Sequence, residues 1–291
     1  MLNPSSNSNL PIGYTGRFFP GNWRPAREEI AFAHANNFRA IQFRGKEEGL
    51  GELHLGDPVS VVAGALRASS VAAVLEIMGP LTFDGRTESG MSPLDLLIAN
   101  LPAIHALPCP YVHLHLHMTH HPVDQTDRER IYALEDSIIP QFVAAVGLAK
   151  QHNFAFGFEH NDPDSILFAN PARCLRALNQ VPGLRFVWDF NHTHPDDLAG
   201  FRALATHLSI LHISDTPLPA VNHHLPLGRG TVDLASNIRI CLAANFSGPA
   251  ILEIGGLAKT SGLGHDTDQA LIQSADLLNT ILANTKKEAP C

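Results

Sequence analysis

Short apolar segments alternate eight times with longer segments of helical periodicity along this chain of 291 residues. The short segments are rich in β-branched and aromatic residues, which is typical of buried strands. They cover residues 11–16, 39–45, 71–79, 111–118, 154–160, 184–191, 208–214 and 248–254. The segments between them repeat apolar residues at the spacing of one helical face, as Ile138, Phe142 and Val146 do. This alternation is the strongest constraint on the fold.

Alternating strands and helices predict parallel strands that are joined by crossover helices. Eight such units in about 250 residues match a closed (β/α)8 barrel. A doubly wound open sheet is the alternative, because alternation alone does not prove closure. We predict an α/β protein with a single eight-stranded parallel TIM barrel over residues 11–285. Residues 1–10 are expected to be a disordered N-terminal tail and residues 286–291 a C-terminal tail.

Composition limits the partners and the compartment. The chain has 20 basic and 28 acidic residues, a formal net charge of −8, which disfavours binding to nucleic acid. Its four cysteines show no CxxC spacing, so neither a zinc cluster nor a disulfide framework is indicated. No segment resembles a signal peptide or a membrane span of about 20 apolar residues. We expect a cytoplasmic protein without membrane or nucleic-acid partners, and the sequence leaves a homo-oligomer open.

Four consecutive predicted strands end in a residue that can ligate a metal. FAFGF is followed by Glu159, RFVW by Asp189, LSIL by His212 and AIL by Glu253. The loops after the carboxyl ends of the strands form the active face of a TIM barrel. We therefore expect the functional site at these four positions. For any one of them alone, a helix cap or a solvated loop residue is the alternative.

The direction of these side chains predicts a metal site. Alternate residues of a strand share a face, so Glu159 points inward with Gly157, while Phe156 and Phe158 face the helices. Three converging carboxylates repel one another unless a cation lies between them. Three carboxylates and one imidazole favour Mn²⁺, Mg²⁺ or Co²⁺, with Zn²⁺ as a further candidate. The sequence thus predicts one divalent ion per chain.

Several motifs resemble those of the xylose isomerase-like barrel superfamily, which contains sugar isomerases, epimerases and abasic-site endonucleases. In order, these motifs are FEHND (158–162), WDFNH (188–192), HISD (212–215), LGRGTVD (227–233) and ILEI (251–254). The architecture matches over essentially the whole chain, and the specific motifs lie in its second half. The resemblance implies that the four strand-end residues are the metal ligands. It also implies that Glu159 and Glu253 form an acid/base pair and that His192 binds the substrate.

The chemistry of such a site indicates a metal-dependent isomerase or epimerase of a small sugar or keto-polyol. One glutamate takes the proton next to the substrate carbonyl, a metal-stabilised enediolate forms, and the second glutamate returns a proton. Return on the opposite face gives epimerisation, and return to the adjacent carbon gives isomerisation; the sequence leaves both open. A lyase such as a keto-inositol dehydratase is the alternative, because it begins with the same proton transfer. A barrel that only binds carbohydrate is a third hypothesis.

The chain departs from the family pattern at three places. Ketose 3-epimerases resemble one another in a glutamate shortly after the strand-five ligand and an arginine shortly after the strand-seven histidine. The stretches HNDPDS (160–165) and ISDTPL (213–218) lack both, so we take Arg229 as the candidate cation for the substrate. The endonuclease branch has an Asp-x-His motif where this chain reads VNHH (221–224), with Asn222 in place of the aspartate. An abasic-site endonuclease is therefore a less favoured interpretation.

The fourth predicted strand, YVHLHLHM, carries three histidines on one face. We expect His115 and His117, nearest the strand end, to bind the substrate, and His113 to line the barrel interior in hydrogen bonds. Gln42 and Glu76, near the ends of the second and third strands, are further candidates for hydrogen bonds to sugar hydroxyls.

Overall fold

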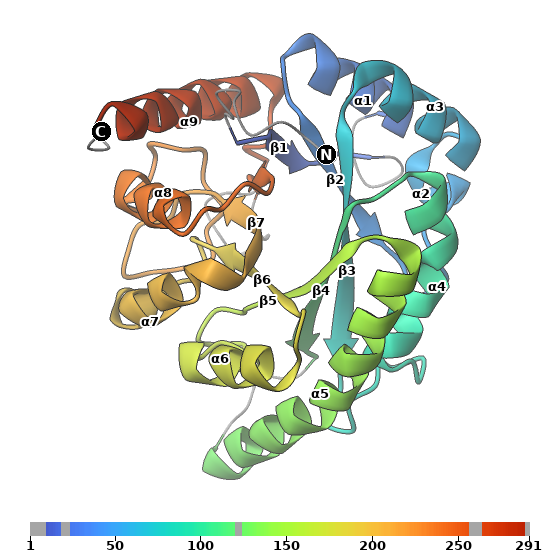
Figure 1. Ribbon diagram of the computed structural model, residues 1–291, viewed down its shortest axis with the longest axis vertical. Coiled ribbons are helices and arrows are strands. Elements are labelled where there is room, and N and C mark those ends of the chain that lie inside the picture. The colour runs from blue at the N-terminus through green and yellow to red at the C-terminus, as the bar shows by residue number, and fades with distance from the viewer. Residues whose placement is uncertain (1–9, 19–23, 120–123, 256–263, 289–291) are drawn as a thin grey trace.

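The computed structural model describes residues 10–18, 24–119, 124–255 and 264–288. Its eight parallel strands close into one barrel in sequence order, because β1 pairs with both β2 and β8. Figure 1 shows the arrangement of the strands and the surrounding helices. The strands are β1 (Ile12–Thr15), β2 (Ala40–Gly45), β3 (Ala72–Leu81), β4 (Tyr111–Met118), β5 (Ala155–Glu159), β6 (Arg185–Asp189), β7 (Leu208–Ile213) and β8 (Ala250–Leu252). The prediction of a single (β/α)8 barrel is confirmed.

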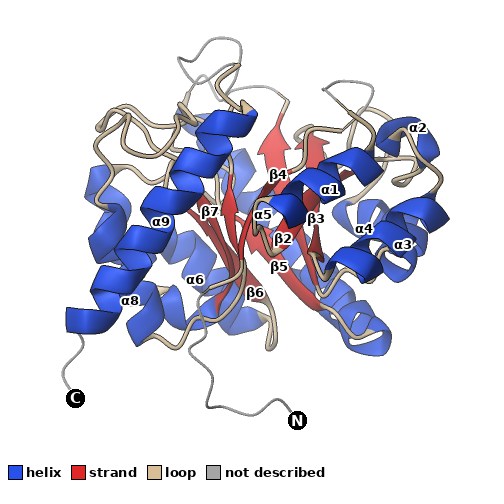
Figure 2. Cartoon of the chain, turned by 90° about the horizontal axis from the view of Figure 1, so that it is seen from above, coloured by secondary structure: helices blue, strands red, loops and turns tan. Residues whose placement is uncertain are grey.

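Helices follow the strands and surround the barrel (Figures 1 and 2). They are α1 (Ala26–Ala35), α2 (Glu52–Leu55), α3 (Val59–Ser69), α4 (Pro93–Ala106), α5 (Gln125–His152), α6 (Pro171–Gln180), α7 (Leu198–Ala203), α8 (Leu234–Ala243) and α9 (Asp268–Glu288). Several begin where a polar side chain accepts a backbone N–H of the first turn. These caps are Ser92 for α4, Asp124 for α5, Asn170 for α6 and Asp233 for α8.

The ends of the domain differ by a few residues from the expected range 11–285. Leu10 is buried in the core, and α9 continues to Glu288, within the segment that was expected to be a tail. Backbone hydrogen bonds and packing decide where an element ends, and a sequence pattern locates such ends only to within a few residues. Residues 1–9 and 289–291 of the two expected tails lie outside the described residues.

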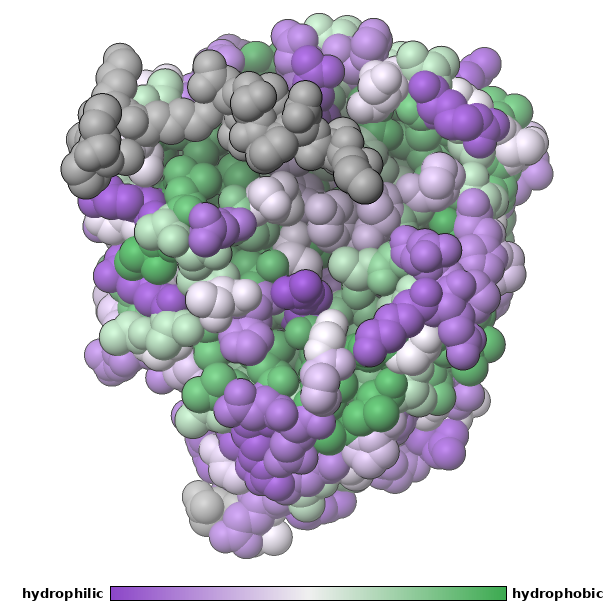
Figure 3. Space-filling view, viewed as in Figure 1, coloured by the Kyte–Doolittle hydropathy of each residue, from purple (hydrophilic) through white to green (hydrophobic). Residues whose placement is uncertain are grey.

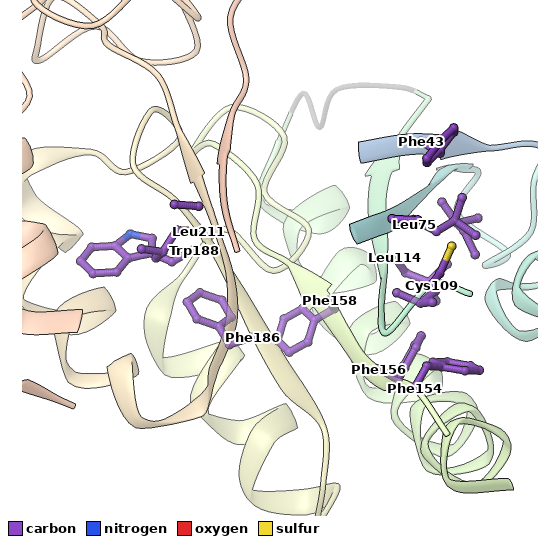
Figure 4. Packing of buried hydrophobic residues seen from close by; sticks show 14 of the residues in the cluster. Phe43, Leu75, Cys109, Leu114, Phe154, Phe156, Phe158, Phe186, Trp188 and Leu211 are labelled. Carbon is purple, nitrogen blue, oxygen red and sulfur yellow. The ribbon is translucent and has the colours of Figure 1, made fainter. Parts of the chain in front are cut away.

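The core has two parts, one outside and one inside the barrel wall. Alternate strand residues pack against the helices, and Figure 4 shows Phe43, Phe156, Phe158, Phe186 and Trp188 among them. The interior is filled by a smaller apolar plug. Its buried members are Ala40, Val74, Val187, Ile210 and Ile251.

A layer of polar residues lies next to the apolar plug inside the barrel. Two positions further along each of these five strands, the next inward residue is polar and buried. The five polar residues are Gln42, Glu76, Asp189, His212 and Glu253. Since successive inward residues of parallel strands form layers, the plug closes the barrel below and the polar layer lies above it, towards the carboxyl ends.

Helix α5 is long and apolar enough, by length and composition alone, to be considered as a membrane span over Thr126–His152. Its apolar residues Ile138, Phe142 and Val146 are buried, and it packs against α4 and β5. This burial is typical of a core helix.

On the face of the molecule seen in Figure 3, hydrophilic and hydrophobic residues are interspersed.

Candidate metal centre and active site

The four predicted ligand residues come together at the carboxyl end of the barrel. One ligand atom each from Glu159, Asp189, His212 and Glu253 lies within 4.8 Å of the others. Glu159 and Asp189 are the last residues of β5 and β6, His212 is the last but one of β7, and Glu253 directly follows β8. All four are buried. The alternation of inward and outward residues therefore produces the convergence that the sequence pattern predicts.

His212 lies between the two glutamates of the cluster. Its Nδ1 is 3.0 Å from Oε1 of Glu159 and 3.0 Å from Oε2 of Glu253. Burial alone would lower the pKa of His212, but the two carboxylates outweigh burial and hold this pKa well above its usual range. Burial likewise opposes ionisation of Glu159, yet His115 and His212 hold its pKa well below the usual range. The surroundings thus favour the charged form of both glutamates, whereas burial raises the pKa of Asp189.

Unpaired oxygens in the cluster test whether it suits a metal ion. Among the described residues, Glu159 Oε2, Asp189 Oδ2 and Glu253 Oε2 are buried and make no hydrogen bond, although each lies 3.0–3.4 Å from a histidine ring nitrogen. A buried polar atom without a partner costs roughly 1–3 kcal/mol, and more when it is charged. A divalent cation among these oxygens would supply the missing partner, and the three oxygens and one nitrogen suit a hard or borderline ion. The residues present therefore fit such an ion.

Asp189 is held in place by the loop that follows β6. Its Oδ1 accepts the backbone N–H of Asn191 at 2.7 Å, which leaves Oδ2 to face the cluster. On the other side, the His160 ring donates from Nδ1 to the carbonyl of Asn161 and accepts the Asp189 N–H at Nε2. Burial lowers the pKa of His160 to about 3, so this ring is neutral and supports the backbone. His160, which directly follows the candidate ligand Glu159, thus has a structural role.

His192 and His115, two of the expected substrate-binding residues, border the cluster. His192 Nε2 is 3.2 Å from Asp189 Oδ2, and its Nδ1 donates to the carbonyl of His160. His115 Nδ1 is 3.1 Å from Glu76 Oε1, and its Nε2 donates to Asn161 Oδ1. Burial opposes the charge of His115, but the carboxylates of Glu159 and Glu76 raise its pKa to about 10. The two carboxylates thus favour the cationic form of His115.

The other two histidines of β4 differ in their surroundings. His117 is half-buried, and its Nδ1 has no hydrogen-bond partner among the described residues. His113 is completely buried one layer below His115, with Nε2 3.4 Å from Glu159 Oε2. Neither ring nitrogen of His113 makes a hydrogen bond within the described part of the chain, which differs from our expectation. The apolar plug beneath it offers no acceptor.

The two arginines near the site contrast with each other. Arg229 is exposed and, within the described ranges, forms no ion pair or hydrogen bond with the four ligand candidates. Arg44, on β2, instead lies 3.5 Å from Glu253 Oε1 through Nη2 and 3.6 Å from Glu76 Oε2 through Nε. Its side chain is 52% exposed. The sequence reasoning missed Arg44, although it shares the inward period of β2 with Ala40 and Gln42.

Gln42 and Glu76 lie lower in the barrel than the sequence suggested. β3 continues to Leu81, so Glu76 is in the middle of a strand. Both side chains are completely buried and bonded to protein groups. They support the cluster from below, and the expectation that they face sugar hydroxyls was wrong.

A second group of ligand-type residues, Asp189, His192 and His224, lies beside the cluster. His224 Nδ1 donates to the carbonyl of Glu253, and its Nε2 is 2.9 Å from Asn222 Oδ1. The Asn222 amide nitrogen in turn donates to Asp162, which fixes the amide orientation. Both ring nitrogens of His224 therefore lie within hydrogen-bond distance of protein oxygens.

Comparisons with known proteins identify the family of this chain and solved structures with the same fold. The family described as "Xylose isomerase-like TIM barrel" matches residues 30–280. Among solved structures, an L-ribulose 3-epimerase is 14% identical with a TM-score of 0.74, covering 96% of this chain and 97% of that one. A D-allulose 3-epimerase from Methylomonas sp. is 16% identical with a TM-score of 0.69, covering 94% and 98%.

An endonuclease has the same fold. AP endonuclease, family 2, from Brucella melitensis is 16% identical with a TM-score of 0.64, covering 92% of this chain and 99% of that chain. A comparison with curated proteins finds no match. At these identities, the solved structures show a shared fold, and the chemistry has to be argued from the site.

Proposed function

This chain belongs to the xylose isomerase-like TIM barrel family, and from that premise we propose that it is a divalent-metal-dependent isomerase or epimerase of a small sugar or keto-polyol. One observation carries the proposal: a buried cluster of three carboxylates and one imidazole in which each carboxylate keeps an oxygen without a hydrogen bond. A divalent cation would give these three oxygens a direct partner. The sugar epimerases of the same fold support the reaction class.

Glu159, Asp189, His212 and Glu253 would hold the ion, with Mn²⁺, Mg²⁺ or Co²⁺ as the first candidates and Zn²⁺ as a further one. When bound, a divalent ion acts as a Lewis acid that polarises a substrate carbonyl and so acidifies the neighbouring C–H bond. The protein must then supply a base for that proton and an acid that returns it.

Glu159 and Glu253 are the proposed acid/base pair. They come from β5 and β8, separated by two strands of the barrel wall, so they would approach a metal-bound substrate from different sides. One carboxylate takes the proton next to the carbonyl, and the other returns a proton. Glu253 is the less buried of the two, at 7% exposed against 1%, and we assign it the first contact with the substrate.

Substrate oxygens would be held by the residues that border this pair. His192, His115 and His117 present ring nitrogens at the carboxyl end of the barrel. We assign the role of the substrate cation to Arg44 in preference to Arg229, because Arg44 already contacts Glu253 and leaves half of its side chain exposed. A guanidinium offers five N–H donors, and two carboxylates at 3.5–3.6 Å do not use them all.

Dehydration by a lyase is the second candidate, and His115 favours it. This imidazolium lies 3.3 Å from Glu159 Oε2 and could give a proton to a departing hydroxyl. An endonuclease is not proposed, because the chain has Asn222 where that branch has an aspartate and carries a net charge of −8.

Turnover of a panel of ketoses and keto-polyols in D₂O, with Mn²⁺ added, tests the proposal. We expect deuterium on the carbon next to the carbonyl and a product of the same composition as the substrate; loss of water would identify the lyase. Glu253→Gln keeps an oxygen ligand but removes the base, so turnover should fall about 10²–10⁴-fold while the metal is bound more weakly but not lost. Glu28→Gln, at an exposed site on α1, is the control. Near-full activity of Glu253→Gln would contradict the two-glutamate mechanism.

A further inference from the structure

Gln42 connects the cluster to the opposite side of the barrel. It is completely buried on the inward face of β2, and its Oε1 lies 2.9 Å from Nε2 of His212 on β7. Its amide nitrogen donates to Glu76 Oε2 at 3.1 Å and to Thr15 Oγ1 at 3.3 Å. Every polar atom of this amide thus has a partner, although 170 residues separate Gln42 from His212.

The two ends of the Gln42 amide cannot exchange places. If the amide were reversed, its oxygen would face the Glu76 carboxylate, and two acceptors would meet inside the barrel. Glu76 is itself held in place, because His115 donates to its Oε1 and Arg44 lies 3.6 Å from its Oε2. The carboxylate therefore fixes the amide, and the amide presents an oxygen to His212.

An acceptor at Nε2 determines which nitrogen of His212 carries the proton. Nε2 must be N–H in order to donate to Gln42, so the neutral ring has its lone pair on Nδ1. Nδ1 is the nitrogen that lies 3.0 Å from both Glu159 and Glu253. The lone pair is thus directed at carboxylate oxygens of both glutamates of the cluster.

We propose that Gln42 is a positioning residue that fixes the tautomer and ring orientation of His212 for metal binding, through the chain of hydrogen bonds Glu76–Gln42–His212. This inference rests on the metal site of the proposed function. The alternative is that Gln42 only fills the interior, in which case its replacement changes stability without a specific effect on the ion.

Metal affinity separates the two roles. Gln42→Met keeps the volume but loses the acceptor towards Nε2 of His212. Thr15→Val removes only the outer hydrogen bond of the amide and is the matched control. We expect Mn²⁺ binding, measured by isothermal titration calorimetry without substrate, to weaken about 10–100-fold in Gln42→Met. It should stay within a few-fold of wild type in Thr15→Val.

A second measurement observes the tautomer directly. In Zn²⁺-loaded, ¹⁵N-labelled protein, His212 should show a protected Nε2–H proton, assigned by its loss in His212→Ala. Gln42→Met should expose this proton to exchange. Equal Mn²⁺ affinity and an equally protected proton in wild type and Gln42→Met, with both folded by circular dichroism, would overturn the inference while leaving the metal site intact. A wild type that binds no divalent ion would overturn the proposed function as well.

Discussion

On β6 and β7, the inward residue that follows the apolar plug is a candidate metal ligand, Asp189 or His212. Val187 and Ile210 belong to the apolar plug, and the next inward residues of the same strands are the two candidate ligands. The neighbours between them, Trp188 and Leu211, pack outside the barrel wall. A substitution at either ligand can therefore remove a donor to the ion without reaching the outer core.

We expect Asp189→Asn and His212→Ala to lose most of the bound divalent ion. Asn removes a negative charge from the cluster, and Ala removes its only nitrogen donor. Metal content of the purified proteins, measured by elemental analysis after incubation with Mn²⁺ and desalting, checks this expectation. His207→Ala, at a histidine outside the cluster, is the control. Unchanged metal content in both ligand variants would show that the four residues are not the ligands.

Among the elements, β1, α1 and α9 are joined by one buried arginine. Arg17, just after β1, donates to Glu29 of α1 at 2.6 Å and pairs with Asp268 of α9 at 2.8 Å. It also donates to the carbonyl of Asp266. Helix α9 follows β8 and Glu253 in the chain. The ion network therefore holds the start of α9 against the end of β1 and against α1.

Removal of the charge on Glu29 should therefore destabilise the fold. Glu29→Gln leaves the buried Arg17 and the nearby Arg24 without their shared carboxylate, and we expect a loss of roughly 3 kcal/mol in the free energy of unfolding. Glu28→Gln, at the exposed neighbouring position, should change it by less than about 0.5 kcal/mol. Urea unfolding followed by circular dichroism compares the two. Equal stability of the two variants would mean that the network contributes no net free energy.

For the molecule as a whole, the ion would join four neighbouring strands at their carboxyl ends. Its proposed ligands come from β5 to β8, whereas the outer core packs every strand against the helices without it. Removal of the ion should therefore lower stability without unfolding the barrel. This separation also means that the metal-free protein can be studied as a folded species.

Metal removal is expected to lower the melting temperature. An ion that binds only the folded state, at a free concentration of 100 times its dissociation constant, adds about 2.7 kcal/mol to the free energy of unfolding. Calorimetric scans with Mn²⁺ and with a chelator measure this difference, and Asp189→Asn should show a much smaller one. An identical melting temperature under both conditions in the wild type would argue against an ion bound in the cluster.

The order of strands and helices, and the inward direction of the four strand-end residues, were determined by the sequence itself. The periods of a strand and a helix are local properties, so they can be read without knowing which segments meet. That is why Phe158 was expected outside and Glu159 inside, as the structure has them. The ends of elements were less certain, since β3 extends to Leu81 through its pairing with β4.

Contacts across the barrel were decided only by the tertiary structure. Arg44 and Glu253 are 209 residues apart, and Gln42 and His212 are 170 apart. Whether such residues meet depends on closure of the sheet and on the stagger between strands, which set the height of each inward side chain in the barrel. The sequence pattern therefore placed Gln42 at the substrate and overlooked Arg44, because the layer that a polar residue occupies is a property of the closed barrel rather than of its own strand.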